Sequence, residues 1–191
     1  MKRLSLYLFL VLFTLQAPSQ ADDIRDFQIE GMSLGDSALD YMNKNEINMN
    51  DLKLYRDDEK YYEIEYVGKK DIFERVSIVI KRNDKKYKIY ALRGYFDIDD
   101  KRTCFKKRDE IVKDIKNLFT NVYFHEGTIN HYFYKDSKQY IAQFTFQPEK
   151  RTSEHIRVEC FIAGKETKKK FSNSLNLIIQ SYEFAKWQDP K

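Results

Sequence analysis

The sequence predicts an α+β protein, with an antiparallel sheet or sheets that have helices packed on one face. The first observation is a series of runs in which apolar and polar residues alternate, as they do in strands. The second is that the later runs are joined by turns too short for the crossovers that parallel strands need. The third is that a helical segment followed by a strand meander occurs twice. The sequence leaves open whether 22–100 and 101–191 are two tandem units or whether 22–191 is one domain with a continuous sheet.

The N-terminal segment 1–21 has the three-part layout of a secretory signal peptide. Lys2 and Arg3 precede an apolar run over 4–15, and small residues at Ser19 and Ala21 fit the peptidase site. A membrane-spanning helix needs about 20 apolar residues, so the run favours a cleaved signal. We expect cleavage after Ala21 and a periplasmic or secreted protein, with no transmembrane anchor in the mature chain.

The first half of the mature chain begins with a short helix near 38–42, which Ser33 or Asp36 can cap. The polar stretch 43–58 predicts a loop or a second short helix. Three alternating runs then predict a meander, with strands at 61–67, 73–80 and 87–96.

The second half begins with the strongest helix signal, at 104–121, where apolar residues recur at helical spacing. Three further strands are expected at 129–134, 139–146 and 156–163. The chain is predicted to close with a C-terminal helix that Ser172 or Asn173 caps. The apolar face of that helix would consist of Leu175, Ile178, Ile179 and Tyr182.

The composition indicates a chain that can bury a sizeable core, with 42% hydrophobic and 15% aromatic residues. Removing Lys2 and Arg3 from the 34 basic residues leaves 32, against 30 acidic residues. A nucleic-acid-binding protein would show a strong basic excess, so we expect no nucleic-acid partner. Neither a phosphate loop nor a dinucleotide fingerprint is present, and we expect no cofactor.

The two cysteines, Cys104 and Cys160, predict a disulfide, because an even number of cysteines in an exported protein usually pairs. A bridge that closes a loop of this length stabilises by about 4 kcal/mol in the loop-entropy model. It would tie the start of the long helix to the strand at 156–163. The alternative is two buried free thiols that never meet.

Two serines are the candidate nucleophiles. Gly31-Met32-Ser33-Leu34-Gly35 matches the G-x-S-x-G pattern, in which a sharp strand-to-helix turn raises the serine of a hydrolase. Ser37 lies in a Gly-Asp-Ser block that is similar to that of a lipase and esterase family. The Asp-x-x-His pair of that family is missing from the chain, and the predicted antiparallel sheet does not suit the turn. We therefore expect no catalytic residue.

The histidines, His125, His131 and His155, have no spacing that offers a shared metal face. No pair of closely spaced ligands surrounds either cysteine. The sequence therefore predicts no metal site.

The segment from Phe27 to Tyr41 resembles the opening of small uncharacterised exported proteins of marine alphaproteobacteria. An extended stretch, the run Ile-x-Gly-Met-Ser over 29–33 and a short helix are also similar to the start of the SmpA/OmlA (BamE-type) assembly lipoproteins. Those proteins share a fold with the β-lactamase-inhibitor protein. The resemblance implies helices ahead of an antiparallel sheet, in two tandem units in the inhibitor protein, and a non-enzymatic role. It transfers no functional residues.

These observations predict a non-enzymatic binding protein of the bacterial cell envelope. Its partner would be another protein or an envelope component, bound through the sheet face or the helical segments. Two alternatives stay open: a serine hydrolase that uses Ser33 or Ser37, and a carrier of a small apolar ligand whose groove is lined by Phe and Tyr.

Overall fold

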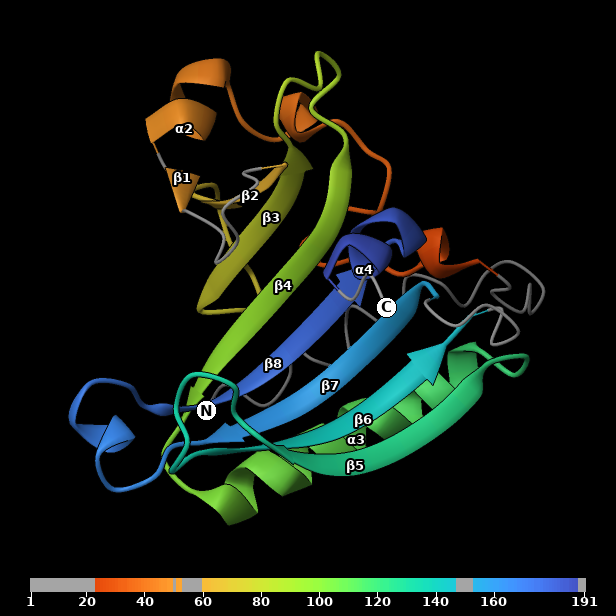
Figure 1. Cartoon of the computed structure of the whole chain (residues 1–191). Helices are drawn as coiled ribbons and strands as arrows, with labels where there is room; N and C mark the ends of the chain where they lie inside the picture. The colour runs from red at the N-terminus through yellow and green to blue at the C-terminus, as the bar shows by residue number, and fades with distance from the viewer. Residues whose placement is uncertain (1–22, 50, 53–59, 147–152, 189–191) are drawn as a thin grey trace.

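The computed structural model describes residues 23–49, 51–52, 60–146 and 153–188, so the predicted signal peptide lies outside the described residues. Within them the fold is α+β, with one antiparallel sheet in the order β1-β2-β3-β4-β8-β7-β6-β5 (Figure 1). The strands are β1 (Asp51–Leu52), β2 (Tyr61–Glu65), β3 (Arg75–Lys81), β4 (Ile89–Ile98), β5 (Tyr123–Asn130), β6 (Lys138–Thr145), β7 (His155–Ile162) and β8 (Asn173–Gln180). The helices are α2 (Lys44–Met49), α3 (Lys101–Leu118) and α4 (Tyr182–Gln188), with 3-10 turns η1 (Ile24–Asp26), η2 (Ala38–Asp40) and η3 (Thr167–Lys169).

The sheet consists of two meanders that join in the middle. Strands β1 to β4 follow one another in the first, and β5 to β8 in the second. The last strand of each meander meets the other: β4 pairs with β8 from Ala91↔Gln180 to Ile98↔Asn173. The predicted fold class is therefore confirmed, and the sheet is continuous through both halves of the chain.

The long helix α3 covers one face of this sheet. Asp100 caps its N-terminus, because the carboxylate accepts from the backbone N–H groups of Arg102 (2.8 Å) and Thr103 (3.0 Å). The cap starts the helix three residues before the predicted position. The buried side of α3 consists of Cys104, Val112 and Ile115.

The Cys104–Cys160 disulfide fixes α3 to β7. The two Cα atoms lie 5.9 Å apart, inside the range of about 4.4–6.8 Å that a relaxed bridge allows. The pairing that the sequence predicts is thus present in the structure, and it ties the first turn of α3 to a central strand. The bridge lies in the main core, where both residues are fully buried.

The main core lies between the sheet and two covering layers, α3 and the N-terminal segment with η1 and η2. Alternate residues of the central strands point into it, and their neighbours point to the opposite face. Fully buried members from both halves of the chain are Ile29, Met32, Ile78, Leu92, Phe144, Ile156, Leu175 and Ile179. This face of the sheet is apolar and covered.

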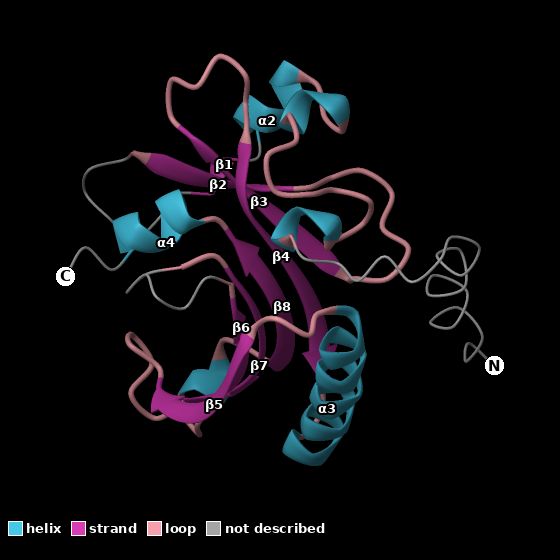
Figure 2. Ribbon diagram, turned by 90° about the vertical axis from the view of Figure 1, so that its right-hand side faces the viewer, coloured by secondary structure: helices cyan, strands magenta, loops and turns pink. Residues whose placement is uncertain are grey.

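The C-terminal helix α4 packs on the other face, opposite α3 (Figure 2). There Phe184 joins a second, smaller cluster with Tyr61, Tyr90 and Ala91. Glu183 accepts from Tyr61 Oη and from Lys81 Nζ, each at 3.0 Å. The helix packs on residues of β2, β3 and β4, and no other helix of the described residues covers the rest of this face.

The predicted C-terminal helix over 172–182 is wrong, because Asn173–Gln180 is the central strand β8. Leu175, Leu177 and Ile179 point into the main core, while Ile178 points to the other face. A strand that is buried on both faces has apolar residues at adjacent positions, and that pattern also fits a helix. The helix begins two residues after the strand, at Tyr182.

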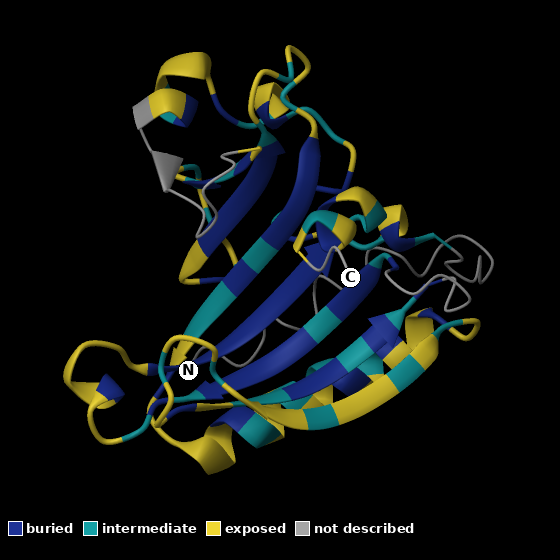
Figure 3. Ribbon diagram, in the orientation of Figure 1, coloured by how far each residue is buried: buried dark blue, intermediate teal, exposed yellow. Residues whose placement is uncertain are grey.

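The strand predicted at 129–134 is displaced. The structure has β5 at Tyr123–Asn130, and a turn follows it. Strand β8, at the other end of the second meander, pairs with both β4 and β7, whereas β5 is an edge strand that pairs with β6 alone. Most of its side chains are exposed (Figure 3), so it lacks a clear alternation of apolar and polar residues.

Candidate functional site

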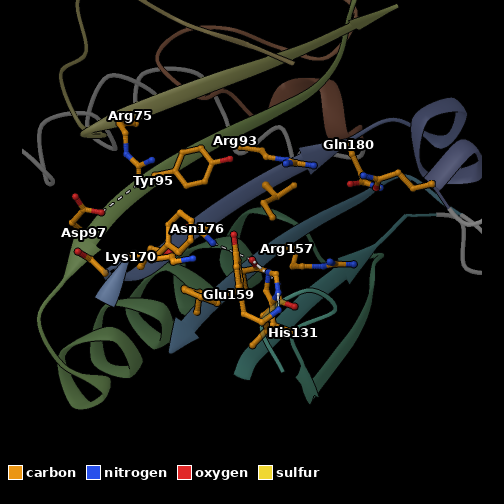
Figure 4. A pocket seen from close by; sticks show the side chains of 18 residues that line it. Arg75, Arg93, Tyr95, Asp97, His131, Arg157, Glu159, Lys170, Asn176 and Gln180 are labelled. Atoms are coloured by element: carbon orange, nitrogen blue, oxygen red, sulfur yellow. Dashed lines mark hydrogen bonds and ion pairs between the residues drawn. The ribbon is translucent and has the colours of Figure 1, made fainter. Parts of the chain in front are cut away.

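The uncovered face of the sheet forms a groove with a volume of about 510 Å³. Its floor comes from β3, β4, β8, β7 and β6, and α4 closes one end. The loops at 131–134 and 170–172 form the other end. The floor is polar, although several of its side chains are buried (Figure 4).

Strand register brings the floor residues together in rows. Arg93 of β4 pairs with Ile178 of β8, which pairs with Arg157 of β7. Neighbouring strands are about 4.8 Å apart, so the two arginines start about 10 Å from each other. The adjacent row consists of Tyr95, Asn176 and Glu159. Arg93 and Tyr95 of the first meander thus face the same groove as the β7 residues, with β8 between them.

Arg93 is held by a carboxylate of the first meander. Its Nη1 donates to Glu63 at 3.3–3.4 Å, and Ser77 Oγ donates to the same carboxylate. Burial, the largest single effect, would lower the pKa of Arg93, but Glu63 together with Tyr95 and Glu159 raises the pKa above its usual value. Arg93 Nε has no hydrogen-bond partner among the described residues.

Arg157 has a neutral partner instead. Its Nε and Nη2 both donate to Gln143 Oε1, at 3.1 and 2.9 Å. Burial lowers the pKa of Arg157, Glu159 acts in the opposite direction, and repulsion from Arg93 lowers it further. The guanidinium keeps its charge at neutral pH, since an arginine pKa lies far above 7. It is therefore a desolvated cation without a hydrogen-bonded anion in the described part of the chain.

Glu159 is the complementary buried anion, with 4% of its surface exposed. Asn176 Nδ2 (3.0 Å) and Gln139 Nε2 (3.2 Å) both donate to its Oε1. Its second oxygen, Oε2, has no hydrogen-bond partner among the described residues, and neither has the side-chain amide oxygen Oδ1 of Asn176. Leaving such atoms unpaired costs about 1–3 kcal/mol each. The floor therefore contains buried hydrogen-bond acceptors without donors among the described residues.

Aromatic side chains wall the far end of the groove. His131 stacks on Tyr134 with ring centroids 4.8 Å apart, and Tyr134 lies 5.0 Å from Phe171. His131 Nδ1 accepts from the backbone N–H groups of Phe133 and Tyr134. Burial lowers the pKa of His131, so its ring is neutral at pH 7 and acts as an aromatic surface.

Asp136 holds the two loops of this wall together. Its carboxylate accepts from the backbone N–H groups of Glu166 (2.9 Å) and Thr167 (3.3 Å) and from the Thr167 hydroxyl. A Cβ at Gly164 would collide with the backbone carbonyl of Asp136, so the loops approach closely there. The aromatic wall is thus anchored by polar contacts.

The other end of the groove lies under α4. Gln180 Nε2 donates to Gln188 Oε1 at 3.1 Å. His155 pairs with Gln180 across β7 and β8 and is 6% exposed. Burial, with repulsion from Arg157 as the second cause, lowers the pKa of His155 to about 3. Its Nε2 has no partner among the described residues.

The two serines considered as nucleophiles lie away from the groove, near the N-terminal turns. Gly31 and Glu30 have positive φ angles of 77° and 51°, and they form a tight turn that Ile29 and Met32 close with two backbone hydrogen bonds. Ser33 follows that turn and is buried, so the local geometry is not a strand-to-helix elbow.

Ser37 caps the short η2 turn. Its Oγ accepts from Leu39 N–H at 3.2 Å and donates to the carbonyl of Lys86 at 2.9 Å. No hydrogen bond joins Ser33 or Ser37 to a histidine in the part of the chain that the structure describes.

The histidines lie on separate elements: His125 is on β5, His131 follows β5, and His155 begins β7. Among residues 23–49, 51–52, 60–146 and 153–188, no group of three or more His, Cys, Asp or Glu side chains could hold a metal ion. In the same ranges, no helix is long and apolar enough to cross a membrane.

Sequence reasoning missed the groove, because its residues form no contiguous motif. A signal was nevertheless present. In β7 and β8 polar residues alternate with core residues, as in Arg157 and Glu159 around Val158 and in Ser174 and Asn176 around Leu175. Such alternation alone predicts an antiparallel strand with one core face and one solvated face, so it indicates the polar face but not the groove.

No protein family, curated protein or solved structure matches the chain. The resemblance of residues 27–41 to exported and assembly proteins therefore stays a prediction.

Proposed function

We propose that the chain is a non-enzymatic binding protein exported to the bacterial cell envelope, and that its partner or ligand occupies the groove. The observation that carries the proposal is the polar floor. Glu159 and Asn176 are more than nine-tenths buried and line the groove, and each has one oxygen without a hydrogen-bond partner among the described residues. A sheet face that served only for stability would bury apolar side chains or satisfy its polar atoms.

Export is supported by the predicted signal peptide and by the disulfide. Disulfides persist in the periplasm and outside the cell, and they are rare in the cytosol. The Cys104–Cys160 bridge is compatible with such a compartment. Intact-mass measurement of the exported protein checks this part: we expect a chain that begins at Asp22, and a mass that still includes residues 1–21 would contradict cleavage.

The polar floor favours a polar ligand over the apolar one that a carrier would hold. Apolar-ligand sites are lined mainly by hydrophobic side chains, whereas the floor here includes Arg93, Arg157 and Glu159. A hydrolase that uses Ser33 or Ser37 gains no support from this groove, because neither serine lines it.

Site-specific photo-cross-linking in the producing cell tests the proposal. A photoreactive phenylalanine analogue replaces Phe171 at the rim of the groove, and in a control protein it replaces the exposed Lys113 on α3. We expect a discrete adduct at position 171 and none at position 113. No adduct at 171, or the same adducts at both positions, would contradict binding in the groove.

A further inference from the structure

We propose that the groove binds a small zwitterion that carries a carboxylate and, beside it, an ammonium group. A free aromatic amino acid is the simplest ligand with this chemistry. The inference rests on the proposed function and specifies what occupies the same groove.

The need for a donor follows from Glu159 and Asn176. Both residues line the groove, and Glu159 Oε2 and Asn176 Oδ1 lack partners among the described residues. The two side chains are already joined through Glu159 Oε1, so their free oxygens belong to one cluster (Figure 4). A carboxylate accepts only, so the group it receives must carry N–H or O–H, and a cationic ammonium makes the stronger bond.

The need for a carboxylate follows from Arg157. The Nε and Nη2 groups of Arg157 both donate to the same amide oxygen of Gln143. The other N–H groups of the guanidinium can therefore donate to a carboxylate. Five N–H donors in a planar fork suit a carboxylate. Because the partner is neutral, the positive charge of the partly buried Arg157 is balanced by no ion pair in the described part of the chain.

Charge balance argues that one ligand supplies both groups. Glu63 neutralises Arg93, with 3.3 Å between their closest paired atoms. Arg157 and Glu159 are two positions apart on the same face of β7, and their charges attract each other, but they form neither a hydrogen bond nor a close ion pair. A ligand with one charge would satisfy one residue and leave the other unpaired, whereas a zwitterion satisfies both.

The aromatic wall supplies a place for a ring. Tyr134, Phe161 and His131 lie within 6.3 Å of one another, centroid to centroid, and Phe161 pairs with Ser174 in the row next to Glu159. Aromatic pairs add about 0.5–1.5 kcal/mol beyond area burial. A volume of about 510 Å³ falls within the range of small-molecule sites, about 300–1,000 Å³.

Isothermal titration calorimetry of the exported full-length mature protein tests the chemistry with matched probes. L-phenylalanine has both groups, its amide lacks the carboxylate, and N-acetyl-L-phenylalanine lacks the ammonium. Glucuronate and glucose form a second pair, in which hydroxyls replace the ammonium. We expect L-phenylalanine to bind, and its amide, N-acetyl-L-phenylalanine, glucuronate and glucose each to bind at least about tenfold more weakly. Binding of glucuronate as tight as that of L-phenylalanine would contradict the need for an ammonium.

Two variants assign the groups to residues. Arg157→Gln should remove the preference for the carboxylate, and Glu159→Gln should remove the preference for the ammonium when L-phenylalanine is the ligand. Arg108→Gln is the matched control: this arginine pairs with Asp109 and Glu126 outside the groove, and its loss should change neither preference. If a variant does not fold, the probe series on the unaltered protein still decides.

Equal binding of charged and neutral probes, or no binding of any probe, would overturn the zwitterion proposal. If position 171 still gives an adduct in that case, the groove binds a ligand of different chemistry and the proposed function survives. If no adduct forms either, both proposals fail.

Discussion

The two faces of the sheet differ in what they bury. The face toward α3 is filled with apolar side chains and closed by a helix, the N-terminal segment and a disulfide. The opposite face also buries side chains, but these are charged or amide groups such as Glu159, Asn176 and Gln180. Adjacent residues on β8 belong to the two environments: Ile179 is fully buried in the core, and Ile178 forms part of the groove floor.

The difference indicates that the two faces of the same strands have different roles. Apolar burial stabilises by about 25 cal/mol per Å², so the covered face supplies most of the folding free energy. Buried polar atoms without partners cost free energy, so the groove face is retained for another reason. The following predictions test this division.

Removal of the disulfide should produce the largest loss. In the double variant Cys104→Ala, Cys160→Ala, the free energy of unfolding should fall by about 4 kcal/mol, because the unfolded chain regains the freedom of a long loop. Urea denaturation of the oxidised protein and the variant measures it. Reduction of the unaltered protein should give a similar loss, and equal midpoints for all three samples would contradict a native bridge.

Core and groove should respond differently to the same truncation on β8. Ile179→Ala should lower the free energy of unfolding by about 3 kcal/mol, within the range of about 2–5 kcal/mol for closed cores. Ile178→Ala should cost less, because this side chain, although only 9% exposed, lies on the groove floor outside the apolar core, so its truncation enlarges the open groove and leaves no closed cavity. Thermal or urea unfolding gives both values. A larger cost at Ile178 than at Ile179 would reverse the assignment of the two faces.

His155 should make stability depend on pH. Its folded pKa of about 3 lies below the unfolded value of 6.5, so between these values the unfolded chain binds a proton that the folded chain does not. Stability from this residue is complete above pH 6.5 and is lost as the pH falls toward 3. Between pH 7 and 5 the loss should be about 2 kcal/mol, since one pKa unit corresponds to 1.36 kcal/mol.

The variant His155→Gln isolates this effect from that of the carboxylates. The difference in free energy of unfolding between the unaltered protein and the variant should change by about 2 kcal/mol from pH 7 to 5. A difference that stays constant over this range would show that His155 titrates normally in the folded protein.

The parts of the fold that the sequence predicts well are those with a clear local period. Helix α3 and strands β2, β3, β4, β6 and β7 have apolar residues at a period that matches one covered face. Strand β8 was misassigned because its two faces are both buried, and Leu175, Ile178 and Ile179 then satisfy a helical spacing too. Strand β5 was displaced because an exposed edge strand needs no apolar alternation.

The disulfide was predictable because cysteine pairing in an exported chain needs no knowledge of the fold. The groove was not, since Arg93 and Arg157 meet only when β4 pairs with β8. That pairing joins the ends of the two meanders, and the misassignment of β8 as a helix concealed it. A long-range strand pairing leaves no local trace in the sequence.

The smallest change is expected at Glu159, and it separates a ligand site from a structural network. Glu159→Gln keeps the oxygen that Asn176 and Gln139 contact and removes a buried charge without an ion-pair partner, so the free energy of unfolding should change by less than about 1 kcal/mol. Glu63→Gln is the matched control. Glu63 pairs with Arg93 at 3.3 Å, and its neutralisation leaves that cation uncompensated, so it should cost about 3 kcal/mol. Urea denaturation at pH 7 measures both. A loss at Glu159 as large as that at Glu63 would mean that the polar floor stabilises the fold, and the unpaired oxygens would then no longer argue for a ligand.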